Sequence, residues 1–345
     1  MPEYRQDPLT RRMVIVSEER ADRPHQFDIT DRPFREICPF CEGNESQTPG
    51  ETAAFRDADS EPNLPGWTVR VVPNKFPAVV PSDVPQVLHD YSFSRTYGRA
   101  DGMGLHEVII DTPRHVLSIA DLTPSEVSAM LTMYRLRLQT LRTDPRWKFV
   151  QIFKNVGAAA GASLPHSHSQ LIAMPFVPLS LMSMLMSGDK YVRDFERCLW
   201  CERLAIERQS GERIIEETEH FIALCPFVSR FAGEIEIYPK NHESGFDQVE
   251  PALLDELAAI FHRTIVRLEK AVFWMKDPLA YNVILNVAPF RSCRHKIEDD
   301  FLPSFHWHFS ILPSLARAAG FEWGTGLHIN PISSEKAAKH LREAI

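Results

Sequence analysis

Two sets of cysteines and histidines have the types and spacing of metal ligands. In a reducing cytosol, a Cys-x-x-Cys pair indicates a metal site before it indicates a disulfide. Two thiolates and two imidazoles complete a tetrahedral zinc shell and leave no open position for catalysis. We therefore predict two structural zinc ions, the first held by Cys38, Cys41, His115 and one histidine of His166/His168, the second by Cys198, Cys201, His242 and one histidine of His306/His308.

The segment His166-Ser167-His168 could also supply a nucleophile. Side chains two residues apart on a strand point to the same face, so one histidine can bind zinc while its neighbour faces a substrate. A neutral imidazole is a competent nucleophile near neutral pH, and histidine forms covalent intermediates. We expect its other ring nitrogen to donate to a backbone carbonyl, which fixes the reactive tautomer.

A loop of small residues comes directly before this segment and reads Asn155-Val-Gly157-Ala-Ala-Ala-Gly161-Ala-Ser163. Small residues let backbone N–H groups approach an anion closely, and such loops bind phosphates. The second half of the chain lacks this loop, because Asn286 is followed by Val-Ala-Pro-Phe and an insertion. We therefore predict phosphate binding and catalysis in the first half alone, with the second half kept for structure or substrate binding.

The elements that must position these residues occur twice in the same order. Each half has a Cys-x-x-Cys pair, a strand and turn with glutamate and histidine eight residues apart, an amphipathic helix, a β-rich stretch ending in asparagine, and a Leu-Pro pair before His-x-His. The first helix is expected to begin at a Thr123-Pro124-Ser125-Glu126 capping box. A shared order of landmarks indicates an internal repeat. We predict an α+β protein made of two copies of one module, residues 1–177 and 190–345. The glutamate and histidine landmarks are Glu107–His115 and Glu234–His242, and the asparagine landmarks are Asn155 and Asn286.

Length and charge exclude several classes of protein. At roughly 150 residues per domain, the 345 residues correspond to two domains. The 38 Lys and Arg against 46 Asp and Glu give a formal charge of -8 without any Lys/Arg-rich tract, so we expect no nucleic-acid partner. We also find no run of about 18 apolar residues and no signal-peptide core, which predicts a cytoplasmic protein with no membrane partner.

The residues quoted above resemble the galactose-1-phosphate uridylyltransferase family of the histidine-triad superfamily. The resemblance runs from Cys38 through the Phe321-Glu-Trp-Gly segment, and its densest part is Asn155-x-Gly-Ala-Ala-x-Gly-x-Ser-x-Pro-His-x-His-x-Gln170. It implies two tandem histidine-triad-like modules, each an antiparallel sheet with packed helices, in a homodimer. It also implies a two-step nucleotidyl transfer, in which a nucleotidyl-histidine forms from a nucleotide-sugar and is then attacked by a sugar 1-phosphate or by phosphate.

The resemblance also implies roles for individual residues. His168 resembles the nucleophile, and Gln170 resembles the residue that hydrogen-bonds the transferred phosphoryl group. Asn155, Gly161 and Ser163 then belong to the phosphate site. The Val71-Val-Pro-Asn74-Lys-Phe76-Pro stretch resembles the nucleoside-binding segment, with Asn74 and Phe76 as the contacts expected there. The implied zinc ligands are Cys38, Cys41, His115 and His166 in the first module, and Cys198, Cys201, His242 and His306 in the second.

Three features depart from the commoner family pattern. The residue between the first two histidines is Ser167 rather than proline, and the second metal set has the cysteines of the ADP-glucose phosphorylase branch. The segment Gly320–Gly326 reads Gly-Phe-Glu-Trp-Gly-Thr-Gly and lacks the lysine–tyrosine–glutamate combination of a galactose-selective pocket. Our first hypothesis is a UDP-glucose–hexose-1-phosphate uridylyltransferase of galactose metabolism. The alternatives are adenylyl transfer from ADP-glucose to phosphate, nucleotide hydrolysis, and a non-enzymatic zinc-ribbon binding protein, against which the acidic balance and the phosphate loop speak. The remaining histidines, His106 among them, are predicted to be surface or hydrogen-bonded residues.

Overall fold

The computed structural model describes residues 1–7, 13–18, 37–82, 98–271, 279–290, 303–315 and 319–344. Three of the histidines predicted to be surface or hydrogen-bonded residues, His25, His89 and His295, lie outside the described residues, as does Leu302 of the second Leu-Pro pair.

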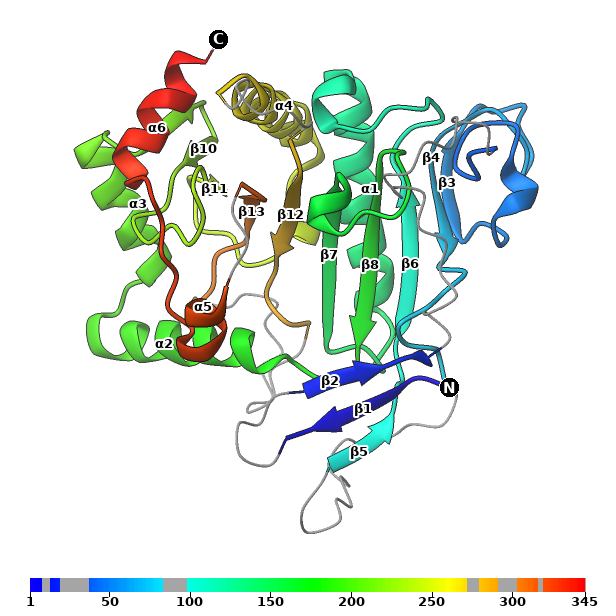
Figure 1. Ribbon diagram of the computed structural model, residues 1–345, viewed down its shortest axis with the longest axis horizontal. Helices are drawn as coiled ribbons and strands as arrows, with labels where there is room; N and C mark the ends of the chain where they lie inside the picture. Colours follow the sequence, from blue (N-terminus) through cyan, green and yellow to red (C-terminus); the bar gives the residue numbers. More distant parts are fainter. Residues whose placement is uncertain are drawn as a thin grey trace.

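One antiparallel sheet of ten strands forms the centre of the molecule (Figure 1). From edge to edge its order is β3 (Ala53–Arg56), β4 (Trp67–Pro73), β6 (Leu105–Ile110), β8 (His168–Met174), β7 (Phe149–Val156), β12 (Tyr281–Asn286), β13 (His308–Pro313), β11 (Ile235–Pro239), β10 (Phe221–Leu224) and β9 (Ile214–Glu217). Each half of the chain supplies five neighbouring strands, which confirms the α+β class and the two-module organisation. The two sheets are continuous, because β7 pairs with β12 and so covers an edge that each module alone would expose.

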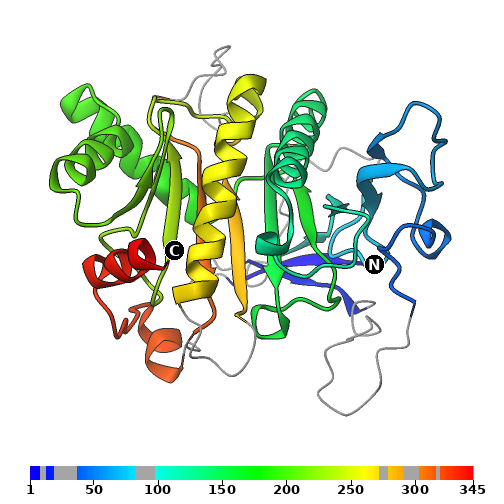
Figure 2. The ribbon, with the colours of Figure 1, turned by 90° about the horizontal axis from the view of Figure 1, so that it is seen from above.

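Two long helices cover one face of this sheet. α1 (Pro124–Arg142) and α4 (Leu254–Ala271) lie side by side (Figure 2). α1 begins as predicted: the Thr123 hydroxyl accepts from the backbone N–H of Glu126 at 3.2 Å, while the Thr123 N–H donates to the Glu126 carboxylate at 2.8 Å. The main apolar core lies between these helices and the strand side chains that face them.

The opposite face carries two smaller apolar clusters, one in each module. The first surrounds the Cys38/Cys41 pair and includes Phe40, and the second surrounds the Cys198/Cys201 pair and includes Trp200. The other helices are α2 (Leu179–Phe195), α3 (Leu199–Ser210), α5 (Gly320–Thr325) and α6 (Ser334–Glu343). Short 3-10 turns are η2 (Glu45–Gln47), η3 (Ile119–Asp121), η4 (Ala158–Ala160), η5 (Phe246–Gln248) and η6 (Pro251–Leu253).

A separate three-stranded sheet lies at one end of the ten-stranded sheet (Figure 1). Its order is β2 (Met13–Val16), β1 (Glu3–Gln6) and β5 (Gly98–Asp101). The buried Tyr4 hydroxyl donates to the carbonyl oxygen of Met103 at 2.9 Å and so ties this sheet to the first module.

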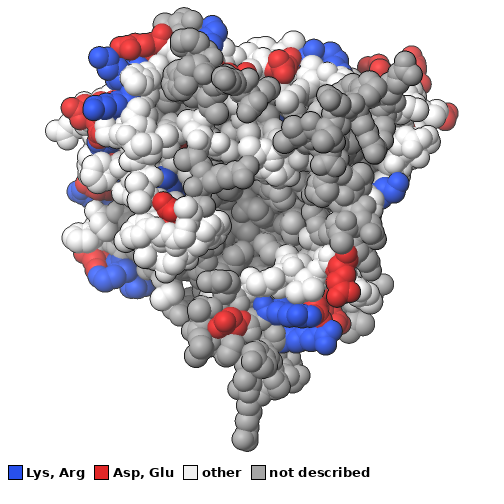
Figure 3. Space-filling view, in the orientation of Figure 1, with Lys and Arg blue, Asp and Glu red and all other residues white. Residues whose placement is uncertain are grey.

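Acidic and basic side chains are mixed on the face of the molecule shown in Figure 3. Among the residues coloured in Figure 3, basic side chains lie next to acidic ones around the rim of that face. Within the described ranges, every helix is too short or too polar to cross a membrane.

The two glutamate landmarks are not structurally equivalent, although both stand eight residues before a histidine. Ile109 pairs with Ser169 and Ile237 pairs with Phe309, and each partner directly follows a His-x-His pair. Ile109 is six residues before His115, whereas Ile237 is only five residues before its histidine. This difference of one residue places the two glutamates on opposite faces of the sheet. Glu107 faces α1 and forms a buried ion pair with Arg137 at 3.0 Å, while Glu234 faces the other way.

Candidate active site

Five of the residues predicted to bind substrate or to react lie around one cavity of about 280 Å³. It opens on the sheet face opposite α1, next to the Cys38/Cys41 pair. Its apolar walls include Phe40, Val72 and Val108, which suit a flat nucleoside base. The predicted residues in its lining are Asn74, Phe76, Ser163, His168 and Gln170.

The imidazole of His168 is held in one orientation. Its Nδ1 lies 2.7 Å from the backbone carbonyl oxygen of His166, and because a carbonyl only accepts, Nδ1 carries the hydrogen. The lone pair is therefore on Nε2. The Phe40 ring packs beside the imidazole with 5.1 Å between ring centroids. A buried imidazole whose Nδ1 is held in this way presents Nε2, the nitrogen that a nucleophile needs.

His106 orients Gln170 and was not singled out from the sequence. The backbone N–H of Ala78 donates to His106 Nδ1 at 2.9 Å, so His106 Nε2 carries the hydrogen. That Nε2 lies 3.0 Å from both Gln170 Oε1 and Asn74 Nδ2, and only the oxygen can accept its hydrogen. Gln170 therefore turns its carbonyl oxygen toward His106, which leaves its amide nitrogen as the donor for a phosphoryl group. Strand alternation from Val108 would have placed His106 on this face.

The small-residue loop is shaped by two glycines and held by a residue of the second module. Gly157 and Gly161 have φ of 81° and 85°, a region that favours glycine. Asn282 of β12 donates through Nδ2 to Asn155 Oδ1 and to the Ala160 carbonyl oxygen, each at 2.8 Å. Asn155 and Gly161 are not among the residues that line the cavity, and their contact with substrate stays a prediction. The sequence did not point to Asn282, because its role depends on the pairing of β7 with β12.

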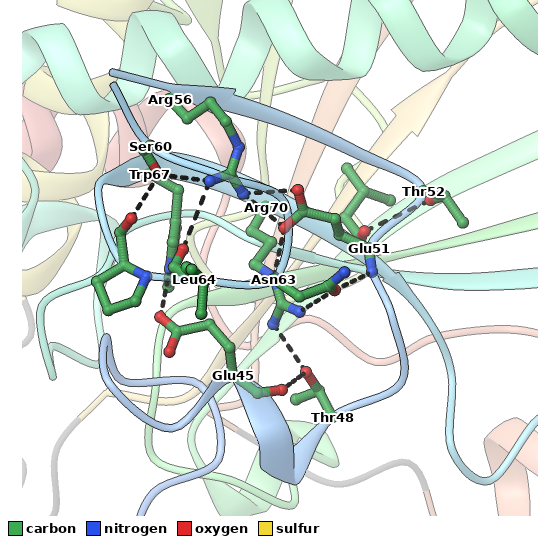
Figure 4. A network of polar contacts seen from close by, with 12 residues as sticks. Glu45, Thr48, Glu51, Thr52, Arg56, Ser60, Asn63, Leu64, Trp67 and Arg70 are labelled. Atoms are coloured by element: carbon green, nitrogen blue, oxygen red, sulfur yellow. Dashed lines mark hydrogen bonds and ion pairs between the residues drawn. The ribbon is translucent and has the colours of Figure 1, made fainter. Parts of the chain in front are cut away.

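A buried arginine stabilises the segment that forms one wall of the cavity (Figure 4). Arg70, 1% exposed, donates to Thr48 Oγ1 at 2.7 Å, to Glu51 Oε2 at 2.9 Å and to Asn63 Oδ1 at 3.1 Å. Thr48 itself lines the cavity. The position of this wall therefore depends on a network that starts in β4.

The first Cys/His cluster has the dimensions of a tetrahedral metal site. The four predicted ligand atoms lie within 4.8 Å of one another. Cys41 Sγ is 3.3 Å from His115 Nδ1, and Cys38 Sγ is 3.5 Å from His166 Nδ1. Bonds of about 2.3 Å to sulfur and 2.0–2.1 Å to nitrogen give such separations in a tetrahedral shell. His166 Nε2 donates to the Thr112 carbonyl oxygen at 2.9 Å, and burial lowers the pKa of His166 to about 4, so its Nδ1 is available to a metal.

The second cluster repeats this arrangement, with all four ligand atoms again within 4.8 Å. Cys201 Sγ lies 3.3 Å from His242 Nδ1 and 3.8 Å from His306 Nδ1. His306 Nε2 donates to the Pro239 carbonyl oxygen at 2.9 Å, as His166 does to Thr112. Both predicted ligand sets therefore come together and could each hold a metal ion, with Cys198 completing the second set.

The second module has a cavity of about 400 Å³ at the place that matches the first. Trp200 replaces Phe40 beside the second histidine, His308, with 4.9 Å between ring centroids. Arg203 and Arg230 in its lining face Glu236 and Glu234, at 3.8 Å and 2.7 Å, so the charges are balanced. Burial lowers the pKa of His308 to about 3. The described residues that line this cavity include no glutamine and no counterpart of Ser163.

A family model described as galactose-1-phosphate uridyl transferase, N-terminal domain, matches residues 1–178. The chain belongs to this family. It is 34% identical over 347 residues to a protein of Arabidopsis thaliana named ADP-glucose phosphorylase, with 99% of this chain and 93% of that protein covered. It is 30% identical over 349 residues to a protein of Thermotoga maritima named galactose-1-phosphate uridylyltransferase, with 99% and 98% covered.

Solved structures of the uridyl transferase family have the same fold. The Arabidopsis ADP-glucose phosphorylase with bound ADP-glucose has a TM-score of 0.73 and 34% identity, and both chains are covered completely. A uridylyltransferase structure has a TM-score of 0.77 at 24% identity, with 99% of this chain and 98% of that chain covered, and shows the fold alone. The resemblance derived from the sequence is confirmed, and family membership identifies the chain as an enzyme of the nucleotidyltransferase type.

Proposed function

We propose that the chain transfers a nucleotidyl group through His168. Its Nε2 attacks the α-phosphorus of a nucleotide-sugar, an N–P bond forms, and the P–O bond to the departing sugar 1-phosphate breaks. An oxygen of a second phosphate-bearing acceptor then attacks the same phosphorus and releases the histidine. The observation that carries this proposal is the His168 Nδ1 bond to the His166 carbonyl oxygen, which leaves the lone pair on Nε2 in a nucleotide-sized cavity.

Gln170 supports the transfer from the same strand. Its amide nitrogen donates to the phosphoryl oxygens, whose negative charge grows as the new bond forms, because His106 already holds its carbonyl oxygen. The N–H groups of the loop that ends at Ser163 bind the neighbouring phosphate. The apolar walls with Asn74 and Phe76 hold the nucleoside.

The first candidate reaction is uridylyl transfer between UDP-glucose and a hexose 1-phosphate, as in galactose metabolism. The family model and the Thermotoga relative support it. A second candidate is adenylyl transfer from ADP-glucose to phosphate. The Arabidopsis relative and the Cys198/Cys201 metal set support this second candidate.

The two Cys/His clusters are proposed to bind one structural zinc ion each. Their four protein ligands leave no open position, so the metal organises the chain and takes no part in the transfer. In the first module that metal would bind both the segment that carries Phe40 and the histidine His166. These two groups lie on either side of His168, so the metal would hold the surroundings of the nucleophile in place.

The chain is also proposed to act in the cytoplasm as a homodimer. Self-association is supported by large apolar side chains that are exposed near one another in the sequence: Phe321, Trp323, Leu327 and Ile329. Light scattering after size exclusion would test this, and a monomer at every concentration would contradict it.

The test of the transfer is the intact mass of the protein after incubation with UDP-glucose or ADP-glucose and no acceptor. A UMP-sized adduct supports the first candidate, and an AMP-sized adduct supports the second. Free mononucleotide that accumulates without an adduct would show hydrolysis instead. If neither donor is consumed, the proposed transfer is wrong.

A further inference from the structure

A fully buried polar cluster lies behind the candidate nucleophile, on the sheet face that α1 covers. Strand alternation places Ser167 and Ser169 on this face and His168 on the other. The members of the cluster are at most 3% exposed, and none of them lines the first cavity: Asp111, Tyr134, Lys154, Ser167 and Ser169.

Lys154 is the centre of this cluster and contacts the backbone of His168. Its Nζ donates to Asp111 Oδ2 at 2.6 Å, to Ser167 Oγ at 2.8 Å and to the His168 carbonyl oxygen at 3.2 Å. Asp111 also accepts from the hydroxyls of Ser167 and Ser169, each at 3.1 Å. All three ammonium hydrogens therefore have acceptors, and one acceptor belongs to the candidate nucleophile itself.

Stability alone is a poor explanation for such a cluster. Taking a lysine out of water is costly, and burial lowers the pKa of Lys154 although Asp111 opposes that shift. Replacing a buried ion pair by apolar side chains of similar volume is often neutral or stabilising. The second module has apolar side chains at the equivalent positions. In the strand registers Leu285 corresponds to Lys154, and Trp307 and Phe309 correspond to Ser167 and Ser169.

We propose that Lys154 is a positioning residue for the nucleophile, an inference that rests on the proposed function. The His168 imidazole donates to the His166 carbonyl oxygen, and Lys154 donates to the carbonyl oxygen of His168 itself. The backbone of residues 166–168 is thereby held from behind while the imidazole faces the cavity. The departure from the commoner proline follows from the same arrangement, because Ser167 supplies a hydroxyl to Lys154 that proline lacks.

The test compares a single and a double variant. Lys154→Met leaves Asp111 buried without its counterion, so we expect a much lower Tm. Lys154→Met/Asp111→Leu removes the pair and should return the Tm close to that of the wild type. We still expect this double variant to form the nucleotidyl adduct about 10²-fold more slowly at saturating donor, with unchanged donor Kd and zinc content. Tyr134→Phe, which loses only the contact with Ser169, is the matched control and should keep the wild-type rate.

A stable double variant that forms the adduct at the wild-type rate would overturn the proposal. If the wild type forms no adduct with either donor, the proposed function fails, and hydrogen–deuterium exchange of residues 164–172 decides the positioning role separately. We expect faster exchange there in the double variant and no change in residues 304–312 of the second module. Equal exchange in both proteins would then show that Lys154 does not order the segment.

Discussion

The two His-x-His segments occupy matching places in one sheet but have different surroundings. Behind His168 lies a buried lysine with three polar contacts, whereas behind His308 lie Trp307 and Phe309, which pack against Phe246 with ring centroids 5.0 and 5.6 Å apart. In front of His168, Gln170 and Ser163 line the cavity, whereas His308 stacks on Tyr238 with 4.8 Å between ring centroids. The two Cys/His clusters are alike, so the difference lies in what surrounds the second histidine of each pair.

This comparison separates the requirements of the fold from those of the chemistry. Both modules keep the Cys/His cluster, which brings the Cys-x-x-Cys segment and the strand-end histidines together. A nucleophile additionally needs a fixed tautomer, a donor for the phosphoryl group and a backbone that cannot shift. The second module keeps only the first of these three, since His308 Nδ1 lies 3.1 Å from the His306 carbonyl oxygen.

The largest expected difference is between His168→Asn and His308→Phe. We expect the first variant to lose the adduct and to lower turnover on the order of 10⁴-fold or more, because no other group replaces the nucleophile. The second variant should keep the wild-type adduct, with zinc content unchanged in both proteins. Intact mass and steady-state rates measure this. An adduct that survives in His168→Asn would remove the assignment of the nucleophile.

Cysteine substitutions should show that the two metal clusters are alike in stability and unlike in their effect on catalysis. We expect Cys38→Ser and Cys198→Ser each to lose one zinc equivalent and roughly 4 kcal/mol or more of unfolding free energy. Only Cys38→Ser should slow adduct formation at a temperature where both variants are folded, since Phe40 packs on His168. Metal analysis and thermal unfolding check the first part. Equal adduct rates in the two variants would contradict the second part.

Much of this comparison could be predicted from the sequence. The two Cys/His clusters could be predicted because Cys-x-x-Cys and His-x-His place their side chains by local spacing, and the helix at Thr123 could be predicted because a capping box is local too. The family resemblance then assigned His168 and Gln170, and both line the cavity.

The remaining features depend on register between distant strands, which local spacing does not show. The sequence had no signal for the pairing of β7 with β12, so the continuous sheet and the role of Asn282 were missed. The equal spacing of Glu107 and Glu234 was misleading, because the turn in the second module is one residue shorter. Lys154 was missed for a related reason, since its partners Asp111, Ser167 and His168 lie at the ends of β6 and β8 and not on its own strand.

His106 offers an intermediate test of the first site. We expect His106→Phe to lower the rate of adduct formation about 10–100-fold with a smaller change in donor Kd, because Gln170 is then free to rotate its amide. Single-turnover kinetics at saturating donor separate the rate from binding. His262→Phe is the matched control, because this histidine is bonded to the Ala120 carbonyl oxygen away from the cavity. The role of His106 would be disproved if both variants had the same rate.

Asn282 tests whether the second module contributes to the first site. We expect Asn282→Ala to weaken nucleotide binding about 10-fold, because the small-residue loop loses two hydrogen bonds of about 1 kcal/mol each. Isothermal titration with the donor nucleotide measures this. Asn286→Ala removes the other asparagine of β12, whose amide donates to Ser310 Oγ at 2.9 Å and not to the small-residue loop, and should leave the affinity unchanged. An equal loss in both variants would indicate general destabilisation instead.

The smallest effect is expected for His308→Phe on the unfolding free energy. The pH dependence of this free energy should differ from that of the wild type only in acid. Burial, together with Arg203, lowers the pKa of His308 to about 3, below the unfolded value near 6.5. Its contribution to stability is therefore present above pH 6.5 and is lost as the pH falls toward 3, because only the unfolded chain binds the proton in this window. We expect the unfolding free energy of the wild type to decline more steeply than that of His308→Phe, by up to about 1.4 kcal/mol per pH unit. Urea unfolding at a series of pH values measures both slopes, and equal slopes would mean that His308 is charged in the folded protein and does not merely pack as an aromatic ring.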